Sequence, residues 1–492
     1  MLAVSRGVKT INDLNTVRKV DRISWREYLS LLPFVVLGAL VGVLCPWQPG
    51  LSIIGHRALM GIIITIGLWV CKPGGVPFSV SGCFLMMFFL LCGVSGPTVF
   101  SGFTSSSLWV LIPALFFGHA LNKTGLGKRL SYLVIKAFKP TMGGLIFAWV
   151  AIGLFLSALT PSIAVRIVII MPLAKGSADI CGLKKGSTNR ALLLLTAWAM
   201  ALLPGTGWLT GTLLGPVILG LYNSSPKLAG VITFASWSKA ALLPVAIMNI
   251  LLIIGSYFVF RPKPIPVLER EVFVKEYAKL GPVRKEEIIT GFLLSLCFIL
   301  FATGQLHGIP DAAICLGGLF ALTAVGIIRV EDISKGISWD LPIFVGVILG
   351  LGAIFAETGI TPWLAATLTS VLTPVAHNPW LFVFAVTAGL FVVRFFDVTS
   401  LILTMAILIP VIPEMSERFA INPLVWITIF VFTGKFFIMS YQNMFALIGE
   451  SILGGDGWNR KQLALYGTVY LFACLVALVV AVPYWTALGF FK

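Results

Sequence analysis

Long runs of apolar residues separated by short polar segments fill the chain from about residue 28 to its end. Each run approaches the roughly 20 residues that an α-helix needs to cross a bilayer core about 30 Å thick. Uninterrupted runs lie near residues 28–45, 54–71, 78–95, 107–121, 240–260, 288–303, 312–328, 341–356 and 463–489. This pattern predicts an all-α polytopic membrane protein with about 11 transmembrane helices.

Four other apolar stretches contain a polar or helix-breaking interruption. The stretches and their interruptions are 142–174 with Leu159-Thr160-Pro161-Ser162, 191–221 with Pro204-Gly205-Thr206-Gly207, 379–412 with Asp397-Val398-Thr399-Ser400, and 424–450 with Ser440-Tyr441-Gln442-Asn443. Because backbone without helical hydrogen bonds cannot face lipid, the four interruptions should line one cavity. We expect two re-entrant hairpins, 142–174 and 379–412, and two broken helices, 191–221 and 424–450.

The charges of the loops predict how these elements are oriented. The net charge is +16, from 35 Lys and Arg against 19 Asp and Glu, and the cations gather in segments 1–27, 122–141, 175–190 and 261–287. The positive-inside rule places these segments in the cytoplasm. Segment 357–378 contains Glu357 but no Lys or Arg, and should lie outside. Cations spread over short loops argue against nucleic-acid binding. Segment 1–27 lacks a signal-peptide pattern and is expected to be a cytoplasmic N-terminal anchor.

The two halves of the chain repeat the same landmarks. Thr124-Gly125-Leu126 and Thr358-Gly359-Ile360 each end a predicted span, at an offset of 358 − 124 = 234. Ser162 and Ser400 each stand ten residues before a proline, at an offset of 400 − 162 = 238. Since the first hairpin should enter from the inside and the second from the outside, we expect an inverted-topology repeat whose discontinuous helices bind substrate near the midplane. The predicted parts are a first repeat 28–260, a cytoplasmic linker 261–287 and a second repeat 288–492.

Composition restricts the function further. Hydrophobic residues make up 58% of the chain and charged residues 11%, and the mean hydropathy is +1.00, which excludes a soluble globular class. The 8 cysteines stand singly, without a CxxC motif, and are expected to be packing residues. An enzyme would need paired carboxylates, an HExxH-like metal set or a nucleophile with its base, and the sequence contains none of these. A channel would need a continuous polar path, whereas this chain has isolated interruptions.

The hairpin tips resemble those of the divalent anion/sodium symporter family, which contains dicarboxylate, citrate and sulfate carriers. Ser162-Ile163-Ala164 and Ser400-Leu401-Ile402, each followed by an apolar limb to a proline, are similar to the family's paired Ser-Asn-Thr tips. Pro161-Ser162-x-x-x-Arg166 is nearer the plastid 2-oxoglutarate/malate translocators and the bacterial citrate/succinate antiporters. The resemblance covers residues 28–489 and implies a homodimer in which each protomer has a static scaffold and a mobile, elevator-like transport domain.

Both tips depart from the pattern of the sodium-coupled members. Ile163-Ala164 and Leu401-Ile402 stand where those members have asparagine and threonine. The resemblance implies that the missing side-chain oxygens belong to sodium sites and to the substrate cradle. Na⁺ therefore stays a possible co-transported ion without its usual side-chain ligands, and we expect no other cofactor and no metal site.

Four charged residues, Arg166, Arg394, Asp397 and Lys435, lie inside apolar stretches close to the interruptions. Each would cost several kcal/mol if it faced lipid unpaired, so each should face the cavity. Arg166 follows Ser162 by one helical turn and should share its face. Arg394 and Asp397 are three residues apart and can form a charge pair or a cation site. Fixed cations can neutralise a dianion without a co-transported ion.

These residues define a predicted substrate site between the tips and the breaks. Its members are Thr160, Ser162, Arg166, Gly205, Thr206, Thr399, Ser400, Lys435, Gln442 and Asn443. Hydroxyl groups and free N–H groups at helix N-termini favour carboxylate or sulfate oxygens. We expect secondary active transport of small divalent organic anions across a cytoplasmic membrane by anion exchange, with sodium-coupled symport of dicarboxylate or sulfate as the alternative. The expected partners are the small anion, membrane lipid and a second copy of the chain.

Overall fold

The computed structural model describes residues 28–44, 50–139, 141–264, 271–395, 397 and 400–491. Regular structure in these ranges is helical, apart from one isolated β-bridge between Ile421 and Phe491. The all-α class predicted from the apolar runs is therefore confirmed. Thr399, one of the predicted site residues, lies outside the described ranges.

The first half of the chain contains a set of helices that ends in a hairpin, a broken helix and a long helix. The helices before the hairpin are α2 (Leu32–Val43), α3 (Ile53–Cys71), α4 (Phe78–Leu91), α5 (Gly96–Val99), α6 (Ser106–Thr124) and α7 (Leu126–Ile135). The hairpin consists of α8 (Met142–Leu159) and α9 (Ile163–Ile180). The broken helix consists of α10 (Thr188–Leu202), the 3-10 turns η4 (Pro204–Gly207) and η5 (Leu209–Gly211), and α11 (Leu214–Asn223). The long helix is α12 (Phe234–Phe260).

The second half repeats this succession. Its first helices are α14 (Lys285–Ala302), α15 (Gly304–His307), α16 (Asp311–Ala324), α17 (Val330–Lys335), α18 (Asp340–Thr358) and α19 (Ile360–Ala376). The hairpin consists of α20 (Pro379–Val393), α21 (Ile402–Leu408), η6 (Ile409–Val411) and α22 (Ile412–Phe419). The broken helix consists of α23 (Val425–Gly434), η7 (Ser440–Gln442) and α24 (Met444–Leu453). The long helix is α25 (Arg460–Ala487). The orientation of the two halves in a membrane stays a prediction.

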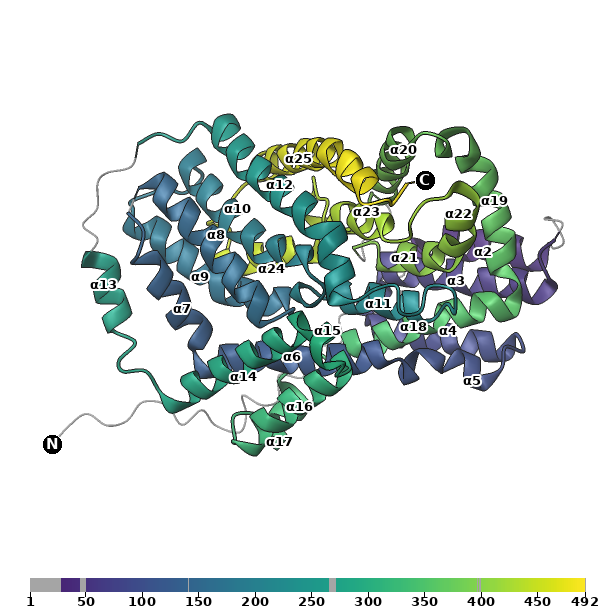
Figure 1. The fold of residues 1–492 in the computed structure, drawn as a ribbon, viewed down its shortest axis with the longest axis horizontal. Coiled ribbons are helices and arrows are strands. Elements are labelled where there is room, and N and C mark those ends of the chain that lie inside the picture. The colour runs from purple at the N-terminus through teal and green to yellow at the C-terminus, as the bar shows by residue number, and fades with distance from the viewer. Residues whose placement is uncertain are drawn as a thin grey trace.

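The two halves are interleaved in space (Figure 1). The second-half helix α24 packs against α9 of the first half, and the first-half helix α11 packs against α18 and α21 of the second. The long helices α12 and α25 lie side by side, and α6, α14 and α16 pack together along the lower side of the view. Each broken helix thus reaches from its own half into the other, which brings both breaks between the two halves.

Three segments that we expected to be loops contain helices. The segment 122–141 contains α7, the segment 357–378 contains α19, and the linker 261–287 contains α13 (Glu271–Ala278). The segments were recognised by their charges alone, and the charge of a segment does not distinguish a coil from a helix. α13 packs against α7, where the Lys136 ammonium lies 3.7 Å from the centre of the Tyr277 ring.

The two prolines in the hairpins act differently on their helices. Pro172 lies inside α9, which continues to Ile180, beyond the end that we placed at residue 174. Pro410 lies in the 3-10 turn η6, and the second hairpin then continues through α22 to Phe419, beyond residue 412. A proline inside a packed helix can kink it without ending it, so a proline alone does not mark the end of a hairpin limb.

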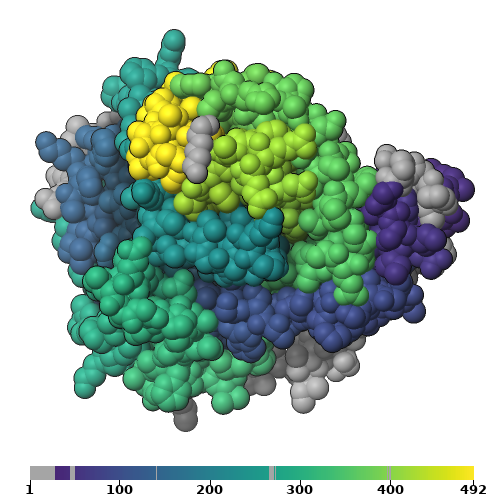
Figure 2. Space-filling model, turned by 45° about the vertical axis from the view of Figure 1, so that its right-hand side comes forward, coloured from purple at the N-terminus to yellow at the C-terminus, as the bar shows by residue number. Residues whose placement is uncertain are grey.

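Several helices have the length and composition of membrane spans. Six helical stretches in the described ranges meet both criteria: Ile53–Cys71, Met142–Leu159, Thr188–Gly207, Phe234–Phe260, Asp340–Thr358 and Arg460–Ala487. Large apolar side chains are widely exposed, and α2, which lies at an edge of the molecule in Figure 2, exposes Leu32, Val36 and Val43. Surfaces of this kind suit contact with lipid. The integral, multi-pass class is confirmed, while the number of 11 spans stays a prediction.

A buried ion pair connects α7 to the start of α14. Arg129 Nε donates to Glu287 Oε2 at 2.8 Å, and both side chains are less than a tenth exposed. The other guanidinium nitrogens of Arg129 donate to the carbonyl groups of Leu280, Gly281 and Pro282, at 3.3, 3.0 and 3.0 Å. The end of the linker is therefore held against α7 by one charge pair and three charge-assisted hydrogen bonds.

A proline in α12 leaves one carbonyl group free to bind neighbouring helices. Pro244 has no N–H, so it cannot donate to the carbonyl of Ala240 one turn earlier. That carbonyl instead accepts from Trp485 Nε1 of α25 at 2.9 Å and from Thr428 Oγ1 of α23 at 3.1 Å. One backbone oxygen therefore joins α12, α23 and α25.

Candidate functional site

The first hairpin tip packs against α6 at a glycine. Thr160 Oγ1 accepts from the backbone N–H of Ser162 at 3.1 Å, and Ser162 caps α9 by accepting from the N–H of Val165 at 3.4 Å. A Cβ on Gly118 of α6 would lie 2.9 Å from both Thr160 Oγ1 and Ser162 Cβ. The tip is thus held close to α6, and its hydroxyl oxygens accept local N–H groups.

The first break contains two backbone segments in direct contact. A Cβ on Gly205 would lie 2.3 Å from the carbonyl oxygen of Gly211, and one on Gly211 would lie 2.1 Å from that of Gly205. Only glycine allows this approach. The hydroxyl of Thr206 donates to the carbonyl of Leu203 at 2.6 Å, while the Thr206 carbonyl accepts from Trp237 Nε1 at 3.1 Å. The Thr206 hydroxyl therefore forms its hydrogen bond within the broken helix.

Arg166 connects the first hairpin to this break. Its side chain is fully buried, and Nη2 donates to the carbonyl of Gly211 at 2.9 Å. Its Nε and Nη1 are also buried and have no hydrogen-bond partner among the described residues. Buried donors without partners are costly. These two nitrogens are therefore suited to donate hydrogen bonds to an acceptor atom of a bound ligand.

The second hairpin contacts the second break through Arg394. Arg394 Nη1 donates to the backbone carbonyl of Asp397, and Nη2 donates to the carbonyls of Gln442 and Phe436, the latter at 3.3 Å. The Asp397 carboxylate accepts from the hydroxyl and the N–H of Thr404, at 2.6 and 3.2 Å. Arg394 thus satisfies carbonyl groups of the broken helix, as Arg166 does in the other half.

The second tip has left-handed backbone. Ser400 and Leu401 have φ values of 59° and 62°, a region that residues other than glycine seldom occupy. The carbonyl oxygen of Ser400 would lie 2.8 Å from a Cβ on Gly434, at the end of α23. The tip therefore packs closely on the residue that precedes Lys435, and any side chain at position 434 would displace it.

The second break presents two amide groups with a fixed orientation. Gln442 and Asn443 are fully buried. Gln442 Oε1 accepts from the N–H groups of Ile438 and Met439 at 2.7 and 2.8 Å, and Asn443 Oδ1 accepts from the N–H of Phe445 at 3.1 Å. Gln442 Nε2 and Asn443 Nδ2 have no partner in the described part of the chain. The oxygens are thus engaged and the nitrogens are available.

Lys435 places a third cation near the two arginines. It follows α23 directly and is 2% exposed, and its ammonium lies 5.6 Å from the centre of the Phe445 ring. The ammonium is within electrostatic range of both Arg166 and Arg394. Lys435 therefore interacts with two buried cations from other elements, and an anion bound close to its ammonium would relieve this repulsion.

The structure brings four of the predicted residues together. Hydrogen bonds and electrostatic interactions connect Arg166, Arg394, Lys435 and Gln442 with the two breaks. The hydroxyl of Thr206 is turned back to its own helix. Sequence reasoning missed residues beyond Gly207, where the first break continues through η5.

Two threonines in this continuation are further candidates. Thr210 and Thr212 are 9% and 1% exposed, and their hydroxyl oxygens are buried without a partner among the described residues. The signal was present in the sequence, since glycine and threonine recur through Gly205-Thr206-Gly207 and Thr210-Gly211-Thr212. Such a run is too polar for the middle of an apolar stretch.

Comparison with known proteins identifies the family. Residues 25–491 match the family described as "Sodium:sulfate symporter transmembrane region". The chain belongs to this family. The sodium:sulfate symporter family consists of membrane transporters, so the expectations of a transporter and of a non-enzymatic function are confirmed.

Named relatives fall in the branch that the tip residues indicated. This family member is 26% identical to dicarboxylate transporter 1, chloroplastic, of Spinacia oleracea over 281 residues, which span 56% of this chain and 49% of the spinach protein. It is 26% identical to the putative malate transporter YflS of Bacillus subtilis over 355 residues, 70% of this chain and 73% of that protein. The assignment near the plastid translocators is thus confirmed.

A solved structure shares the fold. The YdaH transporter of Alcanivorax borkumensis has a TM-score of 0.54 to this symporter-family chain at 14% identity, and the match covers 94% of this chain and 98% of YdaH. At that identity the likeness concerns the arrangement of helices alone.

Proposed function

We propose that the chain carries small divalent organic anions, di- or tricarboxylates, across the cytoplasmic membrane by exchanging one anion for another. The observation that carries the proposal is the buried group of three cations, Arg166, Arg394 and Lys435. One uncompensated charge at membrane depth costs several kcal/mol, and a bound dianion offsets much of that cost. The names of the spinach and Bacillus subtilis relatives support this class of substrate.

The polar atoms without partners support anion binding independent of sodium. Arg166 contributes Nε and Nη1, and Gln442 and Asn443 contribute one amide nitrogen each. These atoms are hydrogen-bond donors, which bind carboxylate oxygens. A hard cation needs oxygen ligands instead, and both amide oxygens already accept backbone N–H groups.

Fixed cations also favour exchange over net uptake. Without an anion, the mobile part of the carrier would take uncompensated positive charge through the membrane, and that step should be slow. A counter-anion on the far side removes this barrier. Neutralisation by Arg166, Arg394 and Lys435 therefore couples the outward movement of one anion to the inward movement of another.

Sodium-coupled symport of dicarboxylate or sulfate is the second candidate. The description of the family favours it. The unpartnered hydroxyl oxygens of Thr210 and Thr212, with carbonyl groups of the first break, are a possible source of oxygen ligands for Na⁺. Symport makes uptake depend on sodium and not on a counter-anion, so the two candidates are separable.

We further propose that the hairpins and broken helices move as one body against α6, α14, α16 and α18, in an elevator-like motion within a homodimer surrounded by lipid. The packing of α24, in the second broken helix, against α9, in the first hairpin, supports movement of these elements as a unit. The family resemblance of the hairpin tips supports the dimer.

The test is uptake of labelled succinate into proteoliposomes, with external sodium or choline and with or without internal unlabelled succinate. We expect internal succinate to accelerate uptake at least tenfold and replacement of sodium by choline to change it little. Strict sodium dependence without counter-anion stimulation would return the protein to the symport candidate.

A matched pair of variants tests the role of the fixed cations. Lys435→Met should abolish exchange because it removes one buried charge from the site. Lys335→Met, which removes an exposed lysine at the end of α17, is the control and should transport normally.

A further inference from the structure

The second break is a short turn that contacts on two sides hold in place. η7 is a single 3-10 turn of three residues, and an element of that length has little stability of its own. On one side, Arg394 donates to the carbonyl of Gln442. On the other side, the hydroxyl of Ser440 donates to Oε1 of Glu450, in α24, at 2.7 Å. The turn therefore depends on groups outside its own residues.

Glu450 is itself oriented by a pair of tryptophans. Trp458 Nε1 donates to the same Oε1 of Glu450 at 3.0 Å. The Trp458 ring lies beside that of Trp198 in α10, with 6.0 Å between the ring centres. Trp198 Nε1 in turn donates to the carbonyl of Phe445 at 3.0 Å, and the N–H of Phe445 binds Asn443 Oδ1. The tryptophan pair thus fixes both the Glu450 carboxylate and the start of α24.

The charge of Glu450 does not itself favour an anion. Among the residues that the structure describes, Glu450 belongs to no ion pair. A negative charge in the broken helix that offers amide donors to an anion repels that anion. A carboxylate accepts hydrogen bonds and never donates, so its favourable contribution is the shared acceptor for Ser440 and Trp458.

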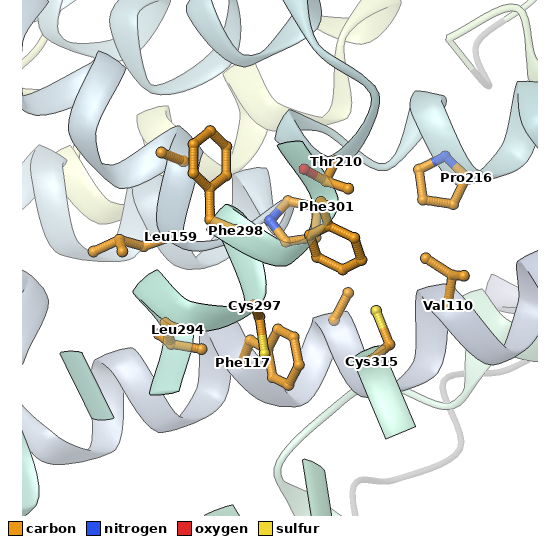
Figure 3. A pocket seen from close by; sticks show the side chains of 13 residues that line it. Val110, Phe117, Leu159, Thr210, Pro216, Leu294, Cys297, Phe298, Phe301 and Cys315 are labelled. Atoms are coloured by element: carbon orange, nitrogen blue, oxygen red, sulfur yellow. The ribbon is translucent and has the colours of Figure 1, made fainter. Parts of the chain in front are cut away.

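An apolar pocket at the first break does not replace the donors of the second (Figure 3). Its wall includes Thr210 of the first break together with Leu294, Phe298 and Phe301 of α14. Apart from the Thr210 hydroxyl, the side chains that line it are hydrocarbon or thiol groups. Carboxylate oxygens need hydrogen-bond donors. The orientation of the amide nitrogens at the second break therefore matters for anion binding.

We propose that Glu450 is a positioning residue for anion binding, which acts through Ser440 to fix the amide groups of Gln442 and Asn443. The inference rests on the proposed function, because it assigns a role in the same site. With Glu450 in place, the turn is ordered before the anion arrives, and binding does not have to order it. Without the acceptor, Ser440 loses its partner, and part of the binding free energy is used to order the turn.

Two substitutions of Glu450 separate positioning from charge. Glu450→Gln removes the charge and retains an acceptor oxygen of the same reach, whereas Glu450→Ala removes both. The assay is isothermal titration calorimetry of purified full-length protein with succinate in sodium-free buffer. We expect Glu450→Ala to weaken succinate binding about tenfold, the effect of one lost hydrogen bond to a charged group. Glu450→Gln should bind succinate at least as tightly as the wild type. Equal affinities of the two variants would overturn the inference.

A double-mutant cycle tests whether Glu450 acts through Ser440. Ser440→Ala should weaken succinate binding to a similar extent, and the double variant with Glu450→Ala should bind no more weakly than either single variant. Additive losses would contradict the proposed route. If Glu450→Ala does not fold, Ser440→Ala carries the test, because it leaves the contact between Glu450 and Trp458 in place. Glu414→Ala, which changes an exposed glutamate of α22, is the control and should bind succinate normally.

Backbone hydrogen exchange gives a readout that needs no ligand. The N–H groups of Ile438 and Met439 donate to Gln442 Oε1, so their exchange reports on the order of the turn. In Glu450→Ala, peptides that cover residues 436–445 should exchange about threefold faster or more, while Glu450→Gln and the peptides of α14 should be unaffected. If the wild type binds no succinate, the proposed function fails, and this measurement decides whether Glu450 positions the turn. Unchanged exchange in Glu450→Ala would refute that role.

Discussion

Replacing Glu287 by Gln should destabilise the contact between the linker and α7 while preserving the shape of the side chain. Glu287 is 3% exposed, and its Oε2 accepts from Arg129 Nε at 2.8 Å and from the backbone N–H of Arg284 at 3.0 Å. Removing one member of a buried ion pair costs about 3–5 kcal/mol. Three carbonyl groups continue to bind the guanidinium, so we expect about 3 kcal/mol, at the lower end of that range.

The assay is thermal loss of the monodisperse peak on size-exclusion, combined with the rate of trypsin cleavage in the linker 261–287. A loss of about 3 kcal/mol should lower the apparent Tm by roughly 3–8 °C and should accelerate cleavage. Glu286→Gln is the control, because Glu286 is an exposed neighbour in the same helical turn. If both variants unfold and are cleaved alike, the buried pair contributes nothing and the reasoning is refuted.

Three further outcomes are expected. Arg166→Gln should lower anion affinity about tenfold or more by removing charge-assisted hydrogen bonds, measured as the succinate concentration for half-maximal exchange; an unchanged value would remove Arg166 from the site. Ser162→Leu and Ser400→Leu should abolish uptake, because both tips are buried and leucine would fill the space beside them. The size-exclusion profile should stay unaltered, and normal uptake would place the site elsewhere. Single cysteines in segment 357–378, but not in segment 122–141, should react with an impermeant maleimide on intact cells; the reverse pattern would contradict the predicted topology.

The four interruptions were predictable because polar and glycine residues are conspicuous inside apolar runs. Thr160 and Ser162 lie at the end of α8 and the start of α9, and Gln442 and Asn443 lie between α23 and α24. Lipid permits such residues at membrane depth only where protein or water surrounds them. The pattern along the chain is therefore enough to locate each break in the sequence and to place it away from lipid.

Three helices were not predictable from the same pattern. α7, α13 and α19 lie in segments that we recognised from loop charge, a signal that concerns orientation in the membrane and contains no information on backbone conformation.

The partners of the buried arginines could not be derived from spacing. Arg166 binds the carbonyl of Gly211 and Arg394 binds that of Gln442, each more than 40 residues away in the chain. Which carbonyl is left free depends on how each break folds, and that depends on close contacts such as the one between Gly205 and Gly211. The sequence predicted buried cations, and only packing determines what they bind.

The carbonyl of Ala240 has a consequence for how this sequence can change over generations. With Pro244 in place, the hydrogen bonds from Thr428 and Trp485 satisfy an oxygen that α12 itself cannot satisfy. In a lineage that replaces Pro244 by alanine, the helix regains its own donor, and selection on the threonine and the tryptophan relaxes. In a lineage that retains the proline, loss of both donors leaves a buried acceptor unpaired. Positions 244, 428 and 485 should therefore vary together among homologues, although more than 180 residues separate the first from the second.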